Sequence, residues 1–278
     1  MYLIHTSYFT ALLTGNGYHF GMKILLVGAM LLGGAANAQD AASCTILTPG
    51  ADDALVASPA NHTVLFESAD VRVLDIHSQP HTQEAVHTHR LPSVMYIERQ
   101  GAGTYDTPDG SDHRSHPTDP NFKPVVRAIE PEGPHWTGNT GDVPFHAIRV
   151  EFKHPGCGLA GWKPAVPATD DALVAAPGTH TLLFENDEVR VLDVHLAPHT
   201  SEPMHSHPWP GVFYVVEAGT VKRLDKGKSV AELRTFPAGV KVLPEPADIH
   251  SVENVGDVPV HLVRFELKYG SVPAPVHP

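Results

Sequence analysis

Residues 52–89 read DDALVASPANHTVLFESADVRVLDIHSQPHTQEAVHTH, and residues 170–207 read DDALVAAPGTHTLLFENDEVRVLDVHLAPHTSEPMHSH. The two stretches are identical at 24 of 38 positions. A second pair of segments repeats in the same order, at residues 130–153 and 245–268. A long stretch that occurs twice indicates two copies of one structural unit. We therefore expect two tandem domains of about 115 residues, each large enough to bury its own core.

Each repeated unit has the pattern of short β-strands. Residues 71–77 (VRVLDIH) and 93–98 (SVMYIE) are rich in β-branched and aromatic side chains, as are their counterparts in the second copy. Residues 146–153 (HAIRVEFK) alternate, which predicts a strand with one face in the core. No segment sustains a helical period over three turns. The sequence therefore predicts an all-β fold of the sandwich or barrel type.

The domain boundaries follow from the repeat. We place the first domain at residues 45–156 and the second at residues 169–270, joined by a Gly/Pro/Ala-rich linker at 157–168. Residues 1–38 form an N-terminal extension. Within it, Met22–Ala38 has one basic residue, an apolar core and a small-residue end, the pattern of a secretory signal. The alternative for this segment is a short buried helix.

A signal of this kind predicts a secreted, periplasmic protein that has no membrane contact after cleavage. Cys44 and Cys157 would remain in the mature chain, and an oxidising compartment favours a disulfide between them over two free thiols. The chain carries 31 acidic and 19 basic side chains, for a net charge of −12, and no basic run. This composition argues against a nucleic-acid-binding protein.

The sequence contains 20 histidines, and some of them have the spacing of metal ligands. Residues i and i+2 of a strand point the same way, so His87 and His89 project together. A third imidazole would come from another strand, and His135 opens the second repeated segment. The second copy has the same arrangement in His205, His207 and His250. These residues predict a divalent metal site in each unit, and the alternative is structural packing or a site that no longer holds metal.

The combination of these motifs resembles the cupin superfamily, and in particular the two-domain cupins. The first family motif contains Pro-Gly, then His-x-His, then Glu, and the second contains His-x-x-x-Asn. The matching residues here are Pro80, His87, His89, His135 and Asn139 in the first unit, and Pro198, His205, His207, His250 and Asn254 in the second. The resemblance covers nearly all of residues 45–270. It implies two tandem jelly-roll β-barrels, a bound Fe, Mn, Zn or Ni ion, a small-molecule substrate and a homodimer.

The sequence departs from the family pattern at two places in each unit. The motif glycine is replaced by His81 and His199, and the motif glutamate by Ser93 and Gly211. A site of three neutral imidazoles resembles the minority of cupins, including thiol dioxygenases and a diketone-cleaving dioxygenase, that hold iron on three histidines. Without the carboxylate the site is more positive by one unit, which favours an anionic or chelating substrate.

Other repeated residues are weaker candidates. Glu84 and Glu202 are the candidate catalytic residues. Strand parity puts them on the opposite face, but they follow a loop that can turn them inward, and the alternative is a supporting or surface role. His81 and His199 come next as loop candidates. We expect His146 and His261 to be core histidines, with support of the metal ligands as the alternative, and His62 and His180 to lie in a surface turn. The insertion around His113 and His116 is expected to be a mobile loop, either a lid or simply solvated. His77 and His195 have no assigned face, and Met95 and Phe213 are expected in the core or in a pocket.

The leading interpretation is a secreted bicupin with a three-His metal site in each barrel. It would act as a metal-dependent enzyme, of the dioxygenase type or an isomerase or lyase, on a small acid or chelating substrate. The alternative is a non-catalytic bicupin that binds or stores a small ligand. A third interpretation has only one of the two barrels active.

Overall fold

The computed structural model describes residues 47–154, 167–243 and 247–268. We call residues 47–154 barrel 1, and residues 167–243 with 247–268 barrel 2. The predicted secretory segment Met22–Ala38 and the predicted disulfide partners Cys44 and Cys157 lie outside the described residues. Within the described part of the chain, no helix is long and apolar enough to cross a membrane.

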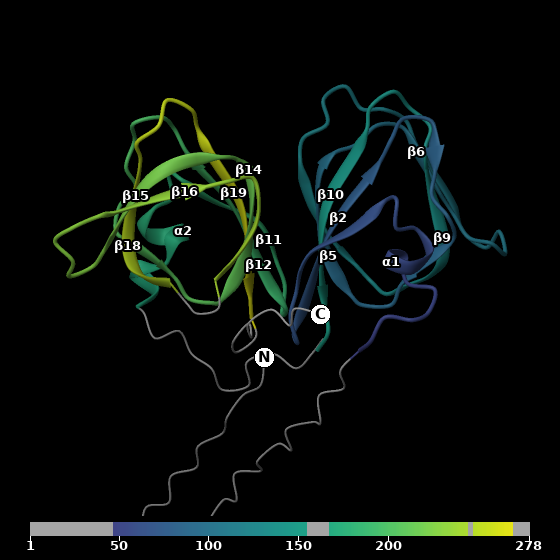
Figure 1. The fold of residues 1–278 in the computed structure, drawn as a ribbon, viewed down its shortest axis with the longest axis horizontal. Helices are drawn as coiled ribbons and strands as arrows, with labels where there is room; N and C mark the ends of the chain where they lie inside the picture. Colours follow the sequence, from purple (N-terminus) through teal and green to yellow (C-terminus); the bar gives the residue numbers. More distant parts are fainter. Residues whose placement is uncertain (1–46, 155–166, 244–246, 269–278) are drawn as a thin grey trace, which may run out of the picture. The chain divides into compact units, whose positions relative to one another are not determined.

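Each barrel consists of two antiparallel sheets (Figure 1). In barrel 1 the first sheet has the order β1 (His62–Glu67), β2 (Val71–Ser78), β10 (Phe145–Phe152), β5 (Ser93–Arg99) and β8 (Val125–Ile129). The second sheet contains β3 (Thr82–Gln83), β9 (Glu132–Asn139), β6 (Gly103–Asp106) and β7 (His113–His116), and β4 (His87–His89) also pairs with β9. Neighbouring strands that are far apart in sequence, such as β2 and β10, are typical of a jelly roll.

Barrel 2 repeats this arrangement. Its first sheet has the order β11 (His180–Glu185), β12 (Val189–Leu196), β19 (Val260–Leu267), β14 (Gly211–Glu217) and β17 (Gly239–Leu243). Its second sheet has the order β13 (His205–His207), β18 (Ala247–Asn254), β15 (Gly219–Asp225) and β16 (Glu232–Phe236). The helices among the described residues are short: α1 (Ala54–Ala57), α2 (Ala172–Ala175) and the 3₁₀ turn Ala168–Asp170. The predicted all-β fold of two tandem jelly-roll units is confirmed.

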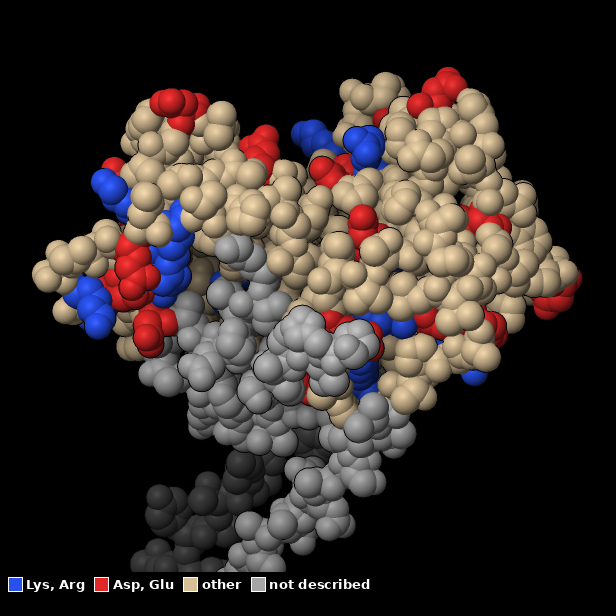
Figure 2. Space-filling model, in the orientation of Figure 1, with Lys and Arg blue, Asp and Glu red and all other residues tan. Residues whose placement is uncertain are grey.

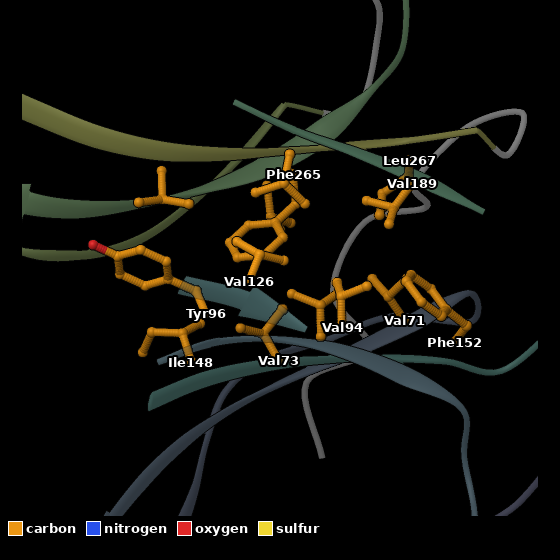
Figure 3. Close-up of a cluster of buried hydrophobic side chains, with 14 of the residues drawn as sticks. Val71, Val73, Val94, Tyr96, Val126, Ile148, Phe152, Val189, Phe265 and Leu267 are labelled. Carbon is orange, nitrogen blue, oxygen red and sulfur yellow. The ribbon is translucent and has the colours of Figure 1, made fainter. Parts of the chain in front are cut away.

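The strand β10 is buried on both faces, and not on one face as its alternation predicted. Its apolar side chains Ile148, Val150 and Phe152 belong to a cluster of buried side chains drawn from the first sheets of both barrels (Figure 3). Its charged side chains Arg149 and Glu151 are buried as well, and Arg149 lines the interior cavity of barrel 1. The interior of this barrel is therefore polar where a simple alternation rule expects it to be apolar.

A buried ion network holds the elements around that interior. Arg72 on β2 pairs with Asp53 at 2.8 Å and with Glu151 on β10 at 2.5 Å. Asp53 also caps α1 by accepting a hydrogen bond from the Leu55 N–H, and it forms a parallel bridge to Thr88 on β4. Since buried charges are stable only when paired, this network fixes α1 and β4 against the first sheet. Barrel 2 has the same network, built from Asp171, Arg190 and Glu266.

The histidines His81 and His199 stand at backbone positions where a glycine would be unstrained. His81 and His199 adopt positive φ angles of 59° and 55°, a conformation that glycine reaches without strain. Their exposed rings contact Asp142 and Asp257, each at 2.9 Å, away from the barrel interiors. The motif residue Asn139 donates its amide N–H groups to Ser78 and Val143 and accepts from Gly141, so it holds the β9–β10 turn.

Charged side chains are scattered over the surface. Figure 2 shows acidic and basic residues interspersed over the face of the molecule that it presents. This distribution agrees with the net charge of −12 and with the absence of a basic run in the sequence.

The buried network makes Arg72 a sensitive position. The Arg72→Ala substitution leaves Asp53 and Glu151 buried without their shared partner, so we expect it to lower the free energy of unfolding of barrel 1 by about 3–5 kcal/mol. Denaturant titration followed by circular dichroism measures this loss. The matched control is Arg90→Ala, which removes an exposed ion pair with Asp52 and should change stability little. Equal stabilities of the two variants would contradict the assignment.

Candidate metal centre

The pairing of β4 with β9 brings the predicted histidines of barrel 1 together. His87 and His135 are direct register partners. The ring centroids lie 5.1 Å apart for His87 and His89, 4.5 Å for His87 and His135, and 5.9 Å for His89 and His135. All three side chains are buried. The two-residue spacing thus places the rings on one side of β4 as expected, even though the register shifts between His87 and His89.

Barrel 2 repeats this geometry closely. His205 and His250 are register partners on β13 and β18. The centroid distances are 5.1 Å for His205 and His207, 4.5 Å for His205 and His250, and 5.8 Å for His207 and His250. The rings of the three predicted histidines therefore lie close together in both barrels.

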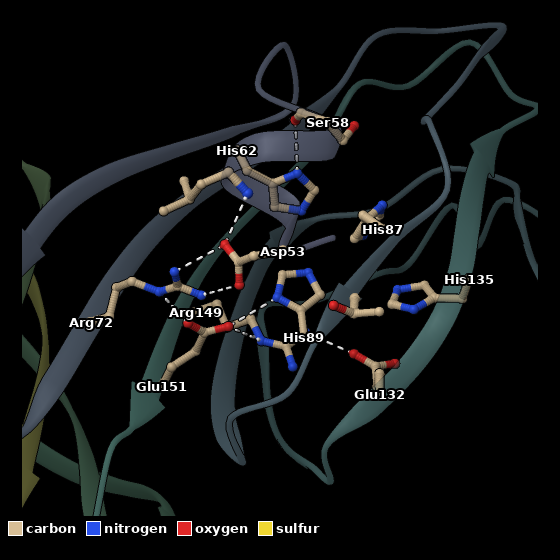
Figure 4. Close-up of polar contacts among 12 residues, drawn as sticks. Asp53, Ser58, His62, Arg72, His87, His89, Glu132, His135, Arg149 and Glu151 are labelled. Atoms are coloured by element: carbon tan, nitrogen blue, oxygen red, sulfur yellow. Dashed lines mark hydrogen bonds and ion pairs between the residues drawn. The ribbon is translucent and has the colours of Figure 1, made fainter. Parts of the chain in front are cut away.

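A fourth histidine joins each cluster, and its predicted location was wrong. His62 and His180 were expected on a surface turn, but only 3% and 4% of their surfaces are exposed. The His62 ring lies 4.8 Å from His87 and 5.1 Å from His89 (Figure 4). Both residues begin a strand, β1 or β11, and their rings point into the barrel. The sequence signal that could have found them is that a histidine stands at this position in both copies of the repeat.

The nitrogen atoms define which residues can share one ion. In barrel 1 the ligand atoms of His62, His87 and His89 all lie within 4.8 Å of one another. In barrel 2 the groups with this property are His180, His205 and His207, and Glu202, His205 and His250. Among the described residues a further group, Asp193, His195 and His261, lies outside these clusters. Neither predicted set of three histidines forms such a group as a whole, because His62 takes the place of His135 in barrel 1 and His207 and His250 fall in separate groups in barrel 2.

Hydrogen bonds determine which nitrogen of each ring is available. The Nδ1 atoms of His87 and His135 lie 2.8 Å from the carbonyl oxygens of Ala85 and Gly133. A carbonyl oxygen only accepts, so Nδ1 carries the proton and Nε2 keeps a free lone pair. His205 and His250 are held in the same way by Pro203 and Asp248.

The remaining ring of each His pair is held by a carboxylate. The Nδ1 of His89 lies 2.9 Å from Glu151, and that of His207 lies 2.8 Å from Glu266. Such carboxylate partners orient metal-binding imidazoles. The Nε2 of His205 is fully buried and has no hydrogen-bond partner among the described residues. A buried lone pair without a donor is what a divalent transition-metal ion would satisfy, so the donor set fits such an ion.

The loop before β4 turns Glu84 inward, against the strand parity that put it on the opposite face. One carboxylate oxygen of Glu84 lies 3.7 Å from the His87 Nε2, and one of Glu202 lies 3.6 Å from the His205 Nε2. Both side chains are buried, and burial raises the pKa of each carboxyl to about 7. Burial excludes the surface role that was the alternative for Glu84 and Glu202. Each carboxyl can instead provide an oxygen ligand or exchange a proton beside the histidines.

The other candidate histidines lie elsewhere. His81 and His199 do not reach the clusters. His146 is half-buried between Asp75 and Glu98, and the hydrogen bond with Glu98 raises its pKa. His261 contacts Asp193 and stacks on His195, so both repeated core candidates have carboxylate partners.

The insertion around His113 and His116 was expected to be a mobile loop or simply solvated; it is exposed to solvent, but it is a strand and not a loop. It forms β7, an exposed strand paired with β6, where His113 contacts Asp106. The segment therefore extends the second sheet of barrel 1.

The cavities above the two clusters differ in size. The cavity of barrel 1 has a volume of about 390 Å³, and that of barrel 2 about 100 Å³. Phe213 lies opposite Arg264 where barrel 1 has Met95 opposite Arg149, so an aromatic ring lines the smaller cavity where a methionine lines the larger one. Met95 and Phe213 were expected either in the core or in a pocket, and each lines the cavity of its barrel. The volume of barrel 1 lies within the usual range for small-molecule sites, and that of barrel 2 lies below it.

The arginines complete the electrostatics of the clusters. Arg149 donates to Glu132 at 2.8 Å, yet its Nε and Nη2 are buried without hydrogen-bond partners among the described residues. Burial, with a contribution from the charge of Arg149, holds the pKa of His89 well below its usual value. The rings are therefore neutral and ready to bind a cation, with a guanidinium beside them.

No family model matches the chain, and no curated protein matches it. Several solved structures are similar. A deletion mutant of oxalate decarboxylase from Bacillus subtilis is 12% identical and covers 77% of this chain and 74% of its own, with a TM-score of 0.48. A mutant of salicylate 1,2-dioxygenase from Pseudoaminobacter salicylatoxidans is 16% identical and covers 72% of each chain, with a TM-score of 0.41.

A cupin domain from Bordetella pertussis is 22% identical and covers 33% of this chain and 91% of its own, with a TM-score of 0.29. Proteins that carry the cupin name are thus among the structural neighbours. No activity or ligand carries over at such identities, because one fold hosts many chemistries.

The neutral state of the rings predicts how stability depends on pH. Burial lowers the pKa of His62 from 6.5 to about 3, so the unfolded chain binds more protons than the folded one below about pH 6.5. Stability from this group is present at neutral pH and is lost as the pH falls. In metal-free protein, the melting temperature of wild type should therefore drop more steeply between about pH 7 and about pH 5 than that of His62→Gln.

Thermal melts with a chelator present measure both slopes. The raised pKa of Glu84 acts in the opposite sense, so the test is the difference between wild type and variant. Identical slopes would show that His62 is not buried as a neutral ring.

Proposed function

We propose that the protein is a metal-dependent enzyme that holds a divalent transition-metal ion in each barrel and a small anionic or chelating substrate beside the ion of barrel 1. The observation that carries this proposal is the state of the buried imidazoles: the Nδ1 atoms of His87, His135 and His205 are engaged by carbonyl oxygens, and the Nε2 of His205 is buried without a hydrogen-bond partner among the described residues. Buried polar atoms normally have a hydrogen-bond partner, so a buried nitrogen without one needs an explanation. A set of free lone pairs in a cavity is instead the arrangement of a metal site.

In barrel 1 the ligands would be His87 and His89 with His62 and His135, and Glu84 is close enough to add an oxygen. A bound ion would supply Lewis acidity and, if it is iron, the redox chemistry of a dioxygenase. Every other part of the reaction depends on what the surrounding side chains bind and orient.

Three side chains of the barrel 1 cavity have distinct roles in this proposal. Arg149 orients the anionic group of the substrate, because its buried Nε and Nη2 lack hydrogen-bond partners among the described residues. Tyr105 stacks on His135 at 4.8 Å, under the guanidinium of Arg114, and forms a flat wall of the cavity. Glu84, with a pKa of about 7, can hold or release a proton at its carboxylate.

The location and the division of labour remain part of the proposal. The pattern of Met22–Ala38 supports export of the protein to the periplasm. The larger cavity supports barrel 1 as the site of turnover. The smaller cavity favours a binding role for barrel 2, which is the part of the non-catalytic alternative that a specific observation supports.

Metal analysis tests the proposed sites. Purified wild-type protein loaded with iron or zinc should contain about two metal ions per chain, one for each cluster. The double variant His87→Ala, His205→Ala should lose them, since each substitution removes a central imidazole. The matched control is His81→Ala, His199→Ala, which changes two exposed rings outside the clusters. Equal metal contents in all three proteins would refute both sites.

Turnover is tested separately. Iron-loaded protein should consume oxygen with at least one member of a panel of thiols, small carboxylic acids and diketones. We expect Glu84→Gln to keep its metal and to lower the rate roughly 10²–10⁴-fold, because the amide cannot exchange a proton. Glu202→Gln is the control in the other barrel. An iron-loaded protein that never consumes oxygen would exclude the dioxygenase reaction.

A further inference from the structure

The two barrels differ in the charges around one equivalent arginine. Arg149 and Arg264 occupy the same register, opposite Met95 and Phe213. In barrel 1, Arg149 donates to Glu132 on β9 at 2.8 Å. In the strand register, Glu132 on β9 lies opposite His89 on β4. The residue that lies opposite His207 in barrel 2 is Ala247. Barrel 2 therefore keeps the arginine but has an alanine at the register position of the carboxylate that compensates it in barrel 1.

Among the described residues, the acidic partner of Arg264 is Glu266, which other groups share. Glu266 lies 3.2 Å from the Arg264 Nε, but it also binds Arg190 at 2.5 Å and the Nδ1 of His207 at 2.8 Å. The Arg264 Nη2 is fully buried and has no hydrogen-bond partner among the described residues. A buried charged donor without an acceptor is costly, and a bound anion would remove this cost.

A second arginine adds to the positive charge. Arg223 occupies the register of Tyr105, since the two pair with Val252 and Thr137 at matching positions of β18 and β9. The cavity of barrel 2 is lined by Arg223, Arg234 and Arg264 against the single glutamate Glu202. The cavity of barrel 1 has three arginines against two glutamates. Arg223 and Arg234 have acidic neighbours of their own, Asp225 and Glu232, whereas Arg264 has among the described residues only its share of Glu266.

The walls of this cavity limit the size of the ligand. Its volume is about 100 Å³, and Phe213, Val221 and Phe236 contribute apolar surface. Val221 stands where barrel 1 has Gly103, as their matching partners Asn254 and Asn139 show. The space suits a compact ligand with one charged end and a short apolar end.

We propose that the barrel 2 cavity binds a small carboxylate anion, with its oxygens on the guanidinium of Arg264 near Arg223 and its short hydrocarbon end against Phe213. A carboxylate matches the planar donors of a guanidinium and forms charge-assisted hydrogen bonds with them. Because the arginines supply the positive charge, this site does not rest on a metal ion in barrel 2.

The probe is propionate, titrated by calorimetry into metal-free full-length protein. We expect wild-type protein to bind propionate at least about tenfold more tightly than the neutral isostere propionamide, because only the anion pairs with Arg264. The key variant is Ala247→Glu, which places a carboxylate at the register where Glu132 compensates Arg149. It should weaken propionate binding about tenfold or more. Ala247→Gln is the matched neutral control and should bind as wild type does.

Two further variants keep the test decisive. Arg223→Gln changes a partly exposed side chain and should fold, and we expect it to weaken propionate binding about threefold to tenfold. Glu132→Gln in barrel 1 should not weaken binding. Equal affinity for propionate and propionamide, no propionate binding by wild type, or a loss caused by Glu132→Gln and not by Ala247→Glu would overturn the proposal. Since metal is absent throughout, these outcomes are independent of the metal analysis above.

Discussion

The ion pair between Arg72 and Glu151 links the scaffold to the site. Glu151 accepts from Arg72 on one side and from the His89 ring on the other, so a single carboxylate joins β2, β10 and the His-bearing strand β4. Arg72 in turn binds Asp53, which caps α1. The orientation of the His89 ring, a candidate metal ligand, is thus determined by charges that must remain paired for the barrel to be stable. The same carboxylate serves folding and ligand placement.

Duplication preserves this network and changes what surrounds it. Arg190 and Glu266 repeat the pair in barrel 2, with His207 in the place of His89. The two barrels differ at positions beside this network, where Phe213 replaces Met95 and Ala247 replaces Glu132. Because these positions do not belong to the network, they can diverge without loss of the fold. Two barrels with one architecture can therefore hold cavities of different size and charge.

The sequence predicted those features that depend on strand periodicity and on the repeat. The convergence of His87, His89 and His135 followed from the two-residue spacing and from the matching second segment. His62 was misplaced because a residue at the start of a strand shows no alternation that would assign it a face. Glu84 was assigned by parity to the wrong side because a loop, and not a regular strand, precedes β4.

The polar interior was the least predictable feature. The alternation of residues 146–153 correctly separates Ile148 and Val150 from Arg149 and Glu151, but it does not reveal that both faces are buried. The general rule assigns charged side chains to solvent, and it fails where they pair with one another inside a barrel. Only the three-dimensional positions of Arg72 and His89 show why the charged face turns inward.

The buried arginines have a consequence for binding in both barrels. A guanidinium beside a cluster of imidazoles opposes the binding of a cation, and nearby carboxylates offset this opposition. Barrel 1 has Glu132 on its arginine, whereas the equivalent arginine of barrel 2 shares Glu266 with two other groups. An anion that binds Arg264 would lower the repulsion felt by a metal ion at His205, and a metal ion there would attract the anion. Since linkage is reciprocal, each ligand must raise the affinity for the other by the same factor. The coupling should be stronger in barrel 2, because the protein itself provides less compensating negative charge there.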